Sequence, residues 1–217
     1  VALESLDALY LLTEQWAQLA GVLQTRVEVA SDIEQRIELF FRLADVLENR
    51  LSDSSQAFEC YREVHYLSPK NSDTISQLER LMRNGVHQAD IAALLEPVYL
   101  EANEWESLYA LLQLRLELEE DEVDILDLRR RLAELSLNQL EQPAEALRWF
   151  GEAFRLDPED DGLLSQMGSL AEATDEFGHL NDVLLEVAIE LDDAERKVHL
   201  WHRSARIVEE RLNDVGQ

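Results

Sequence analysis

The chain has 217 residues, a formal net charge of −27 at pH 7 and 46% hydrophobic residues. That many apolar residues can form a core, whereas the charge opposes binding to nucleic acid or to an anionic membrane surface. No apolar run reaches the roughly 18–20 residues that a membrane-spanning helix needs. We therefore expect a cytoplasmic protein with neither a nucleic-acid nor a membrane partner. The charge is expected to keep the helix surfaces solvated, and it also favours a basic partner.

The pattern along the chain is helical from end to end. Apolar residues recur three and four positions apart, only 7 Gly and 4 Pro interrupt them, and no segment alternates as a β-strand would. We expect about twelve helices joined by connections short enough for antiparallel neighbours. The expected helices cover, in chain order, residues 1–13, 16–30, 33–51, 56–67, 74–83, 89–102, 105–119, 123–139, 143–156, 163–174, 180–191 and 195–212.

Several boundaries of these helices have a chemical cause. The pair Ser31 and Asp32 and the segment 71–73 are expected to cap helices, because their side-chain oxygen atoms can accept from free backbone N–H groups. The pair Asn84 and Gly85 is a good helix end. Pro97 lies inside the pattern of residues 89–102, where a proline costs about 3 kcal/mol. We expect a kink there, or a helix that begins closer to Pro97.

The chain also repeats itself. Residues 16–69 align without a gap with residues 105–158 at a constant offset of 89, and 17 of the 54 aligned positions are identical. A third, partial copy begins at Phe177, at an offset of 161 from Trp16. We therefore divide the chain into copies at about 1–71, 89–160 and 161–217, the last of them incomplete. The different offsets predict an extra helix at about 72–85.

The helical hairpins have a recurring pattern of residue sizes. Their second helices place small, aromatic, small and proline residues in the same order: Ala57, Tyr61, Val64 and Pro69, then Ala146, Phe150, Ala153 and Pro158. Their first helices place a large–small pair between two bulky residues: Phe40, Leu43, Ala44 and Leu47. The chain thus resembles the tetratricopeptide repeat (TPR) proteins, with degenerate repeats of the kind found in longer bacterial arrays. A related helical repeat, the half-repeat type of RNA-processing scaffolds, is the alternative.

The resemblance implies an all-α fold, namely an α-solenoid in which stacked antiparallel hairpins form a right-handed superhelix, as a single domain over residues 1–217. It implies that the first helices line a concave groove, which binds a peptide or a partner subunit without catalysis and without a cofactor. The residues beside the large–small pairs would face this groove. They are Phe41, Asp45, Glu48, Arg130, Glu134, Ser165, Ser169, Glu172, His202, Arg206 and Glu209.

Residues that could support chemistry are few. His199 and His202 share one side of a helix with Glu195 a turn earlier, but this spacing is not a zinc signature and no Cys or third His stands nearby. We therefore expect no metal. A single cysteine, Cys60, excludes an internal disulfide and is expected in the core. The four tryptophans are expected in the core as well: Trp16, Trp105, Trp149 and Trp201.

Three functions remain open at this stage: an interaction scaffold, a structural spacer within a larger repeat protein, and a metal-dependent enzyme. The scaffold is the main prediction, because solenoids present extended binding surfaces. The third copy lacks a second helix, so we expect Trp201, Ala205 and Val208 to be only partly covered. We also expect further repeats beyond Val1 and Gln217, or self-association through the open terminal repeats.

Overall fold

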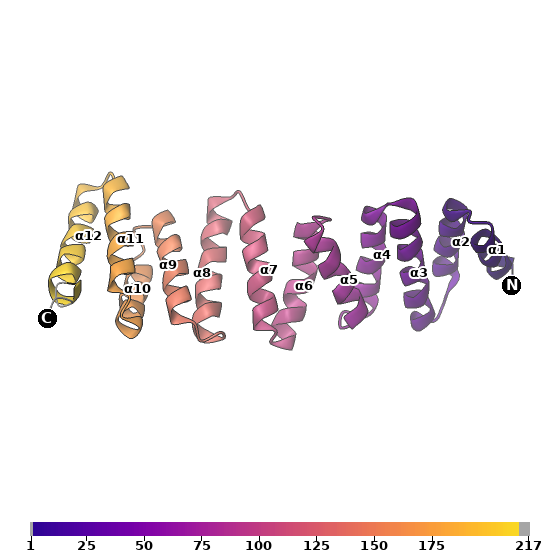
Figure 1. The fold of residues 1–217 in the computed structure, drawn as a ribbon, viewed down its shortest axis with the longest axis horizontal. Coiled ribbons are helices and arrows are strands. Elements are labelled where there is room, and N and C mark those ends of the chain that lie inside the picture. Colours follow the sequence, from indigo (N-terminus) through magenta and orange to yellow (C-terminus); the bar gives the residue numbers. More distant parts are fainter. Residues whose placement is uncertain (1, 213–217) are drawn as a thin grey trace. The chain divides into compact units, whose positions relative to one another are not determined.

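The computed structural model describes residues 2–212. Within that range the chain forms twelve α-helices and a final π-helical turn, and it contains no β-strand (Figure 1). The predicted all-α fold is therefore confirmed. The elements are α1 (Ala2–Leu12), α2 (Trp16–Val29), α3 (Ile33–Leu51), α4 (Ser54–Leu67), α5 (Ser72–Arg83), α6 (Gln88–Ala102), α7 (Trp105–Leu118), α8 (Glu122–Asn138), α9 (Pro143–Leu156), α10 (Asp161–Thr174), α11 (Phe177–Glu190), α12 (Ala194–Ile207) and η1 (Val208–Leu212).

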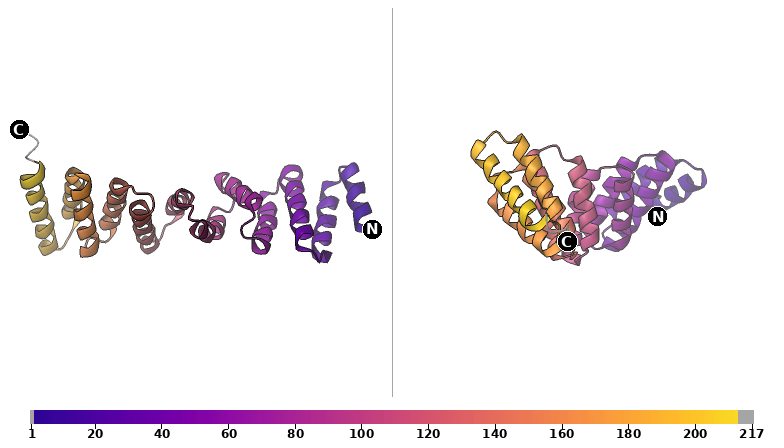
Figure 2. Two further views of the ribbon diagram at one scale, coloured as in Figure 1. Left: turned by 90° about the horizontal axis from the view of Figure 1, so that it is seen from below. Right: turned by 60° about the vertical axis from the view of Figure 1, so that its left-hand side comes forward.

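The chain divides into two compact units, one containing α1–α6 and the other α7–α12 with η1. Within each unit, helices that are neighbours in sequence lie side by side as antiparallel hairpins, such as α3 with α4 and α8 with α9 (Figures 1 and 2). A single continuous solenoid over residues 1–217 stays a prediction. The expected repeats beyond Val1 and Gln217 lie outside the described residues.

The helix ends follow the capping chemistry. Asp32 accepts a hydrogen bond from the backbone N–H of Gln35 at 2.8 Å, and Asn71 accepts from that of Thr74 at 2.8 Å. Gly85 follows the end of α5 with φ at +80°, a region that favours glycine. These boundaries are confirmed, and every expected helix end lies within three residues of the observed one when α12 and η1 are taken together as the last helix.

Helix α6 runs through Pro97 without a break, so the suggested start nearer to Pro97 is wrong. Ile91, Ala92 and Leu95 are fully buried before the proline and Tyr99 is buried after it. Burial of these side chains holds the segment in helical form, although a proline removes one backbone hydrogen bond.

The two sequence offsets recur in the backbone. Glu14, Asn103 and Asp175 all have left-handed φ angles, of 54°, 57° and 59°, and they are related by offsets of 89 and 161 residues. Ser52 and Glu141 form another such pair, with φ of 57° and 55°. Left-handed angles are uncommon for residues other than glycine. The repeat is therefore a property of the backbone as well as of the residue types.

Each unit has its core between successive hairpins. In the second unit, Phe150 and Phe154 of α9 are buried among apolar side chains of α8, α10 and α11. In the first unit, Leu43 of α3 and Phe58 of α4 are buried in the same manner. Removing apolar surface from water at about 25 cal/mol per Å² is the main stabilising contribution.

The tryptophans are less buried than the sequence predicts. Trp201 is 46% exposed, so its expected place in the core is wrong. Helix α12 buries Leu200, Ser204 and Ile207 instead, one position before the expected stripe. This exposure agrees with the prediction that the stripe is only partly covered. Trp16, Trp105 and Trp149 are half-buried.

Candidate functional site

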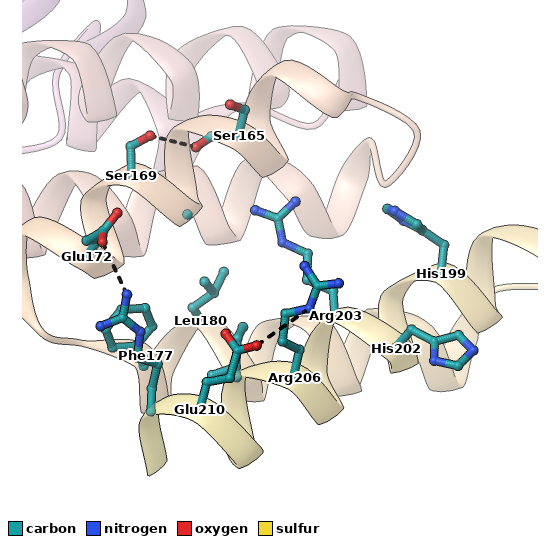
Figure 3. Close-up of a pocket in the computed structure, with 13 residues that line it drawn as sticks. Ser165, Ser169, Glu172, Phe177, Leu180, His199, His202, Arg203, Arg206 and Glu210 are labelled. Atoms are coloured by element: carbon teal, nitrogen blue, oxygen red, sulfur yellow. Dashed lines mark hydrogen bonds and ion pairs between the residues drawn. The ribbon is translucent and has the colours of Figure 1, made fainter. Parts of the chain in front are cut away.

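Five of the eleven predicted groove residues line one hollow between α10 and α12, which has a volume of about 540 Å³ (Figure 3). We call it the α10–α12 hollow. Helix α10 provides one wall, helix α12 with η1 provides the other, and Phe177 and Leu180 of α11 lie between them. The five predicted residues in it are Ser165, Ser169, Glu172, His202 and Arg206.

Other residues of the hollow were not predicted from the sequence. On the α12 side they include His199, Arg203 and Glu210, whereas the predicted Glu209 is outside the lining. These three residues are four and seven apart and so share one helix face, which differs from the predicted face by one position. Repetition could have identified Arg203, because an arginine also occurs at the matching positions of the two earlier copies.

The start of α12 is fixed to the start of α10 by Arg196. Its Nη1 atom lies 2.7 Å from a carboxylate oxygen of Asp161, and its Nε donates to the backbone carbonyl of Pro158 at 2.9 Å. This hydrogen bond from Arg196, together with the attraction between the two charges, lowers the pKa of Asp161. These contacts hold the two walls of the hollow together at one end.

The other end of the hollow is closed by Arg211. It forms an ion pair with Glu172 of α10 at 3.2 Å, and its guanidinium group lies 4.8 Å from the centre of the Phe177 ring. Both contacts cross from η1 to the helices opposite. The walls are therefore joined at both ends while the middle stays open.

Arg203 and Arg206 lie in that open middle. Arg203 is half-buried and donates to the backbone carbonyl of Leu164 at 3.2 Å, and it forms no ion pair with any carboxylate among residues 2–212. Burial lowers the pKa of Arg203; the charge of Arg196 adds to this effect, the charge of Asp161 opposes it, and the charge of Arg206 adds to it again. A guanidinium group remains charged nonetheless. Arg206 contacts Glu210 only at 4.0 Å, and this exposed pair contributes little.

The predicted residues on α3 contact other parts of the first unit. Phe41 packs on the Tyr61 ring with centroids 5.8 Å apart, and Glu48 accepts two hydrogen bonds of 2.6 Å from Arg80 of α5. Burial, followed by the charge of Glu48, raises the pKa of Tyr61 to about 12. Asp45 is exposed. Glu48 thus connects two helices instead of standing free in a groove.

The predicted residues on α8 divide in the same way. Arg130 pairs with Asp157 at 3.2 Å and with Asp160 at 2.7 Å, and so ties α8 to the connection between α9 and α10. Glu134 is exposed. Neither residue lines the α10–α12 hollow.

The two histidines suggested as metal ligands do not point to a common centre. Figure 3 shows His199 on the side of α12 that faces α10, whereas the ring of His202 is turned away from His199. Within residues 2–212, no group of three or more His, Cys, Asp or Glu side chains is placed to hold a metal ion. The absence of catalysis stays a prediction.

A second hollow of about 810 Å³ lies among α2, α3 and α4. Its walls are mostly small or apolar residues, including Gly21, Phe40 and Cys60. Burial, and then the charges of Glu59 and Glu63, raise the pKa of the Cys60 thiol to about 12. Cys60 is therefore an unreactive thiol, as the sequence predicts.

No family model matches the chain, and no curated protein matches it. Among solved structures it is similar to one titled as the functional characterization of PilF from Pseudomonas aeruginosa, with 19% sequence identity over 97% of this chain and 84% of that chain. The TM-score is 0.31, and a likeness this distant supports no statement about activity or partner. Within the part of the chain that the structure describes, no helix combines the length and apolarity needed to cross a membrane.

Proposed function

We propose that this chain is a TPR-like protein-interaction module that holds a peptide or a segment of a partner subunit in the α10–α12 hollow. The observation that supports this is an open hollow whose lining includes the half-buried Phe177 and a cationic side chain, Arg203, that forms no ion pair with a carboxylate of the described residues. Aromatic and arginine side chains, such as Phe177 and Arg203, are enriched at protein interfaces.

The alternative function of a structural spacer predicts hollows filled by the chain itself. Only the α1 end of the first unit has this arrangement, because the buried Asp7 of α1 pairs there with Arg26 of α2 and Arg42 of α3. The hollow among α2, α3 and α4 is open. The α10–α12 hollow has nothing equivalent in its middle. We therefore assign a structural role to the α1 end of the first unit and the binding role to the α10–α12 hollow of the second.

Several finer statements stay predictions. The chain is proposed to act without catalysis and in the cytoplasm, with a protein partner and not a nucleic acid. Self-association through terminal repeats is a further prediction, for which the exposed Trp201 of α12 provides an apolar surface. Aromatic residues are enriched at the centres of protein interfaces.

The test is site-specific photo-cross-linking of the full chain in the cells that make it. Ser169→p-benzoylphenylalanine places the probe in the α10–α12 hollow, and Gln166→p-benzoylphenylalanine places it on the same helix outside the lining. We expect a protein adduct from position 169 that is absent from position 166. Adding Arg206→Glu to the first variant should remove that adduct. If both positions capture the same proteins, the hollow is not the binding site.

A further inference from the structure

The two ends of the described chain contain the same three-helix arrangement at one offset. Helix α2 (Trp16–Val29) becomes α11 (Phe177–Glu190) when 161 is added to each number. Helix α3 (Ile33–Leu51) likewise becomes α12 together with η1, residues 194–212. When the same offset is added to the residue numbers of α1 (Ala2–Leu12), they fall within the range of α10 (Asp161–Thr174). Arg42 therefore corresponds to Arg203, and both occupy the same place in their helices.

At the N-terminal end this arginine binds a carboxylate. Arg42 donates two hydrogen bonds, of 3.0 Å and 2.8 Å, to the two oxygens of Asp7 on α1. Arg26 of α2 also pairs with Asp7, which is only 4% exposed. Two donors directed at the two oxygens are the preferred geometry between arginine and a carboxylate. The position is thus one where an arginine takes an acidic side chain from the facing helix.

At the C-terminal end that acidic side chain is missing. Adding 161 to Asp7 gives Gly168, and adding it to Arg26 gives Val187. A Cβ atom placed on Gly168 would lie 2.6 Å from Nη2 of Arg203, so the guanidinium group lies directly over the bare glycine. Arg203 reaches a backbone carbonyl there instead of a carboxylate. Both Gly168 and Arg203 line the open hollow.

We propose that the α10–α12 hollow binds an acidic segment of a protein partner, and that an Asp or Glu of this segment bonds to Arg203 as Asp7 bonds to Arg42. This inference rests on the proposed function and adds the chemistry of the partner. It replaces the basic partner that the net charge suggests. The carboxylate enters from solvent between the walls, and apolar residues of the segment contact Phe177, which is half-buried.

The local charge supports an acidic occupant. The wall formed by α12 and η1 has five basic and three acidic residues, a balance of +2 with neutral histidines, in a chain whose formal net charge is −27. Three arginines line the hollow against two glutamates. An acidic segment is repelled by the rest of the surface and attracted here, which favours a single docking position.

The test uses fluorescence anisotropy with the full chain and a defined probe. The probe is a fluorescein-labelled peptide rich in Glu and Asp, with Leu and Phe between them, and the comparison peptide has Gln and Asn in place of the acids. We expect the acidic peptide to bind about tenfold more tightly or better. We also expect Arg203→Gln to remove most of this preference. Arg148→Gln should change nothing, because Arg148 is exposed on α9 and, among residues 2–212, bonds only to Glu145.

A variant at Gly168 supplies the missing carboxylate within the chain. Gly168→Asp should pair with Arg203, weaken the acidic peptide about tenfold and raise the melting temperature. Gly168→Asn has almost the same volume without the charge and should retain binding within about threefold. The arginine end that a new Cβ would meet is flexible, so both variants should keep the helical circular dichroism of the wild type.

Each other outcome overturns the inference. Equal weakening by Gly168→Asp and Gly168→Asn would show that filling space, and not charge, blocks the hollow. Tighter binding of a single-stranded oligonucleotide than of the peptide would assign the site to phosphates. Concentration-dependent self-association that Arg203→Gln abolishes would identify a second copy as the occupant. If the peptide fails to bind while the adduct at position 169 persists, the acidic partner is wrong and the proposed function stands.

Discussion

His65 is a buried histidine on α4, and the repeat contains its own comparison for it. The side chain is 6% exposed, and its Nδ1 atom has no hydrogen-bond partner within residues 2–212. Burial lowers the pKa of His65 below its ordinary value. Adding the offset of 89 gives Phe154, which is fully buried in the second unit. A polar ring thus occupies a position where the repeat also accepts an apolar one.

His65→Phe is expected to raise the free energy of unfolding by about 1 kcal/mol at neutral pH, because it removes a buried unpaired nitrogen. That corresponds to roughly 2–4 °C in melting temperature for a chain of this size. Since the folded pKa of His65 is lowered, the unfolded state binds its proton more readily. Wild-type stability from this group is therefore lost as the pH falls through the unfolded pKa of about 6.5.

The measurement compares melting temperatures of the two proteins at pH 7.5 and pH 5.5. The advantage of His65→Phe should grow at the lower pH, while His202→Gln, a change at an exposed position, should follow the wild type. An advantage that is equal at both pH values would show that His65 accepts its proton in the folded state as easily as in the unfolded one.

Single residues were predictable where a residue type has one dominant local use. Asp32 and Asn71 were identified as caps because their side chains compete for backbone N–H groups. The left-handed angles of Ser52 and Asp175 were not predicted, because neither residue is the glycine that usually marks such a position. Both residues are the C-caps of their helices, where a left-handed conformation is common.

At the scale of the elements, α1 depends on one buried carboxylate. Most large apolar residues of α1 are partly or largely exposed, such as Leu9 at 51% and Leu12 at 83%. Asp7 is the single buried residue of this helix, and it is bonded to Arg26 and Arg42. Ion pairs therefore hold α1 against its neighbouring helices, whereas apolar packing holds α4 and α9.

Asp7→Asn is expected to destabilise the first unit by about 2 kcal/mol. Breaking a buried pair leaves charges unpaired, and the value is reduced because Arg42 is 39% exposed. Hydrogen exchange should show the largest loss of protection in α1, and urea denaturation should give the change in stability. Asp182→Asn, at an exposed position of α11, is the matched control. Equal exchange in α1 of both variants would contradict the role given to Asp7.

The helices were more predictable than the hollow between them. Apolar residues three and four positions apart identify a helix, and they identify its inward face when neighbouring helices pack on both flanks of that face. Leu43 and Ala44 of α3 are an example, and both are buried. In α12 the equivalent residues differ, with Ser204 buried and Ala205 exposed. A shift of one residue turns a helix face by about 100°. The prediction therefore included Glu209 and missed Arg203, which determines the chemistry of the site.

At the scale of the whole molecule, the overall net charge does not indicate the local charge of a helix, and the division into two units has a different origin in the repeat pattern. Composition predicted a solvated acidic surface, but it gave no indication that α12 is locally basic. The boundary between the units follows α6. Two helices, α5 and α6, lie between α4 and α7 in the sequence. The corresponding interval between α9 and α11 contains only α10.

The last prediction concerns the independence of the two units. The buried cluster around Phe150 and Met167 draws its side chains only from residues 126–212, and Leu43 and Phe58 are buried within the first unit. We therefore expect the separate fragments 1–102 and 103–217 each to show mostly helical far-ultraviolet circular dichroism and a cooperative thermal transition. Division after residue 140 separates α8 from α9 and splits the second core, so fragment 141–217 should lose helix. If fragment 103–217 is unfolded alone, its core is not sufficient, and the assignment of binding to this unit would then have to be tested only in the intact chain.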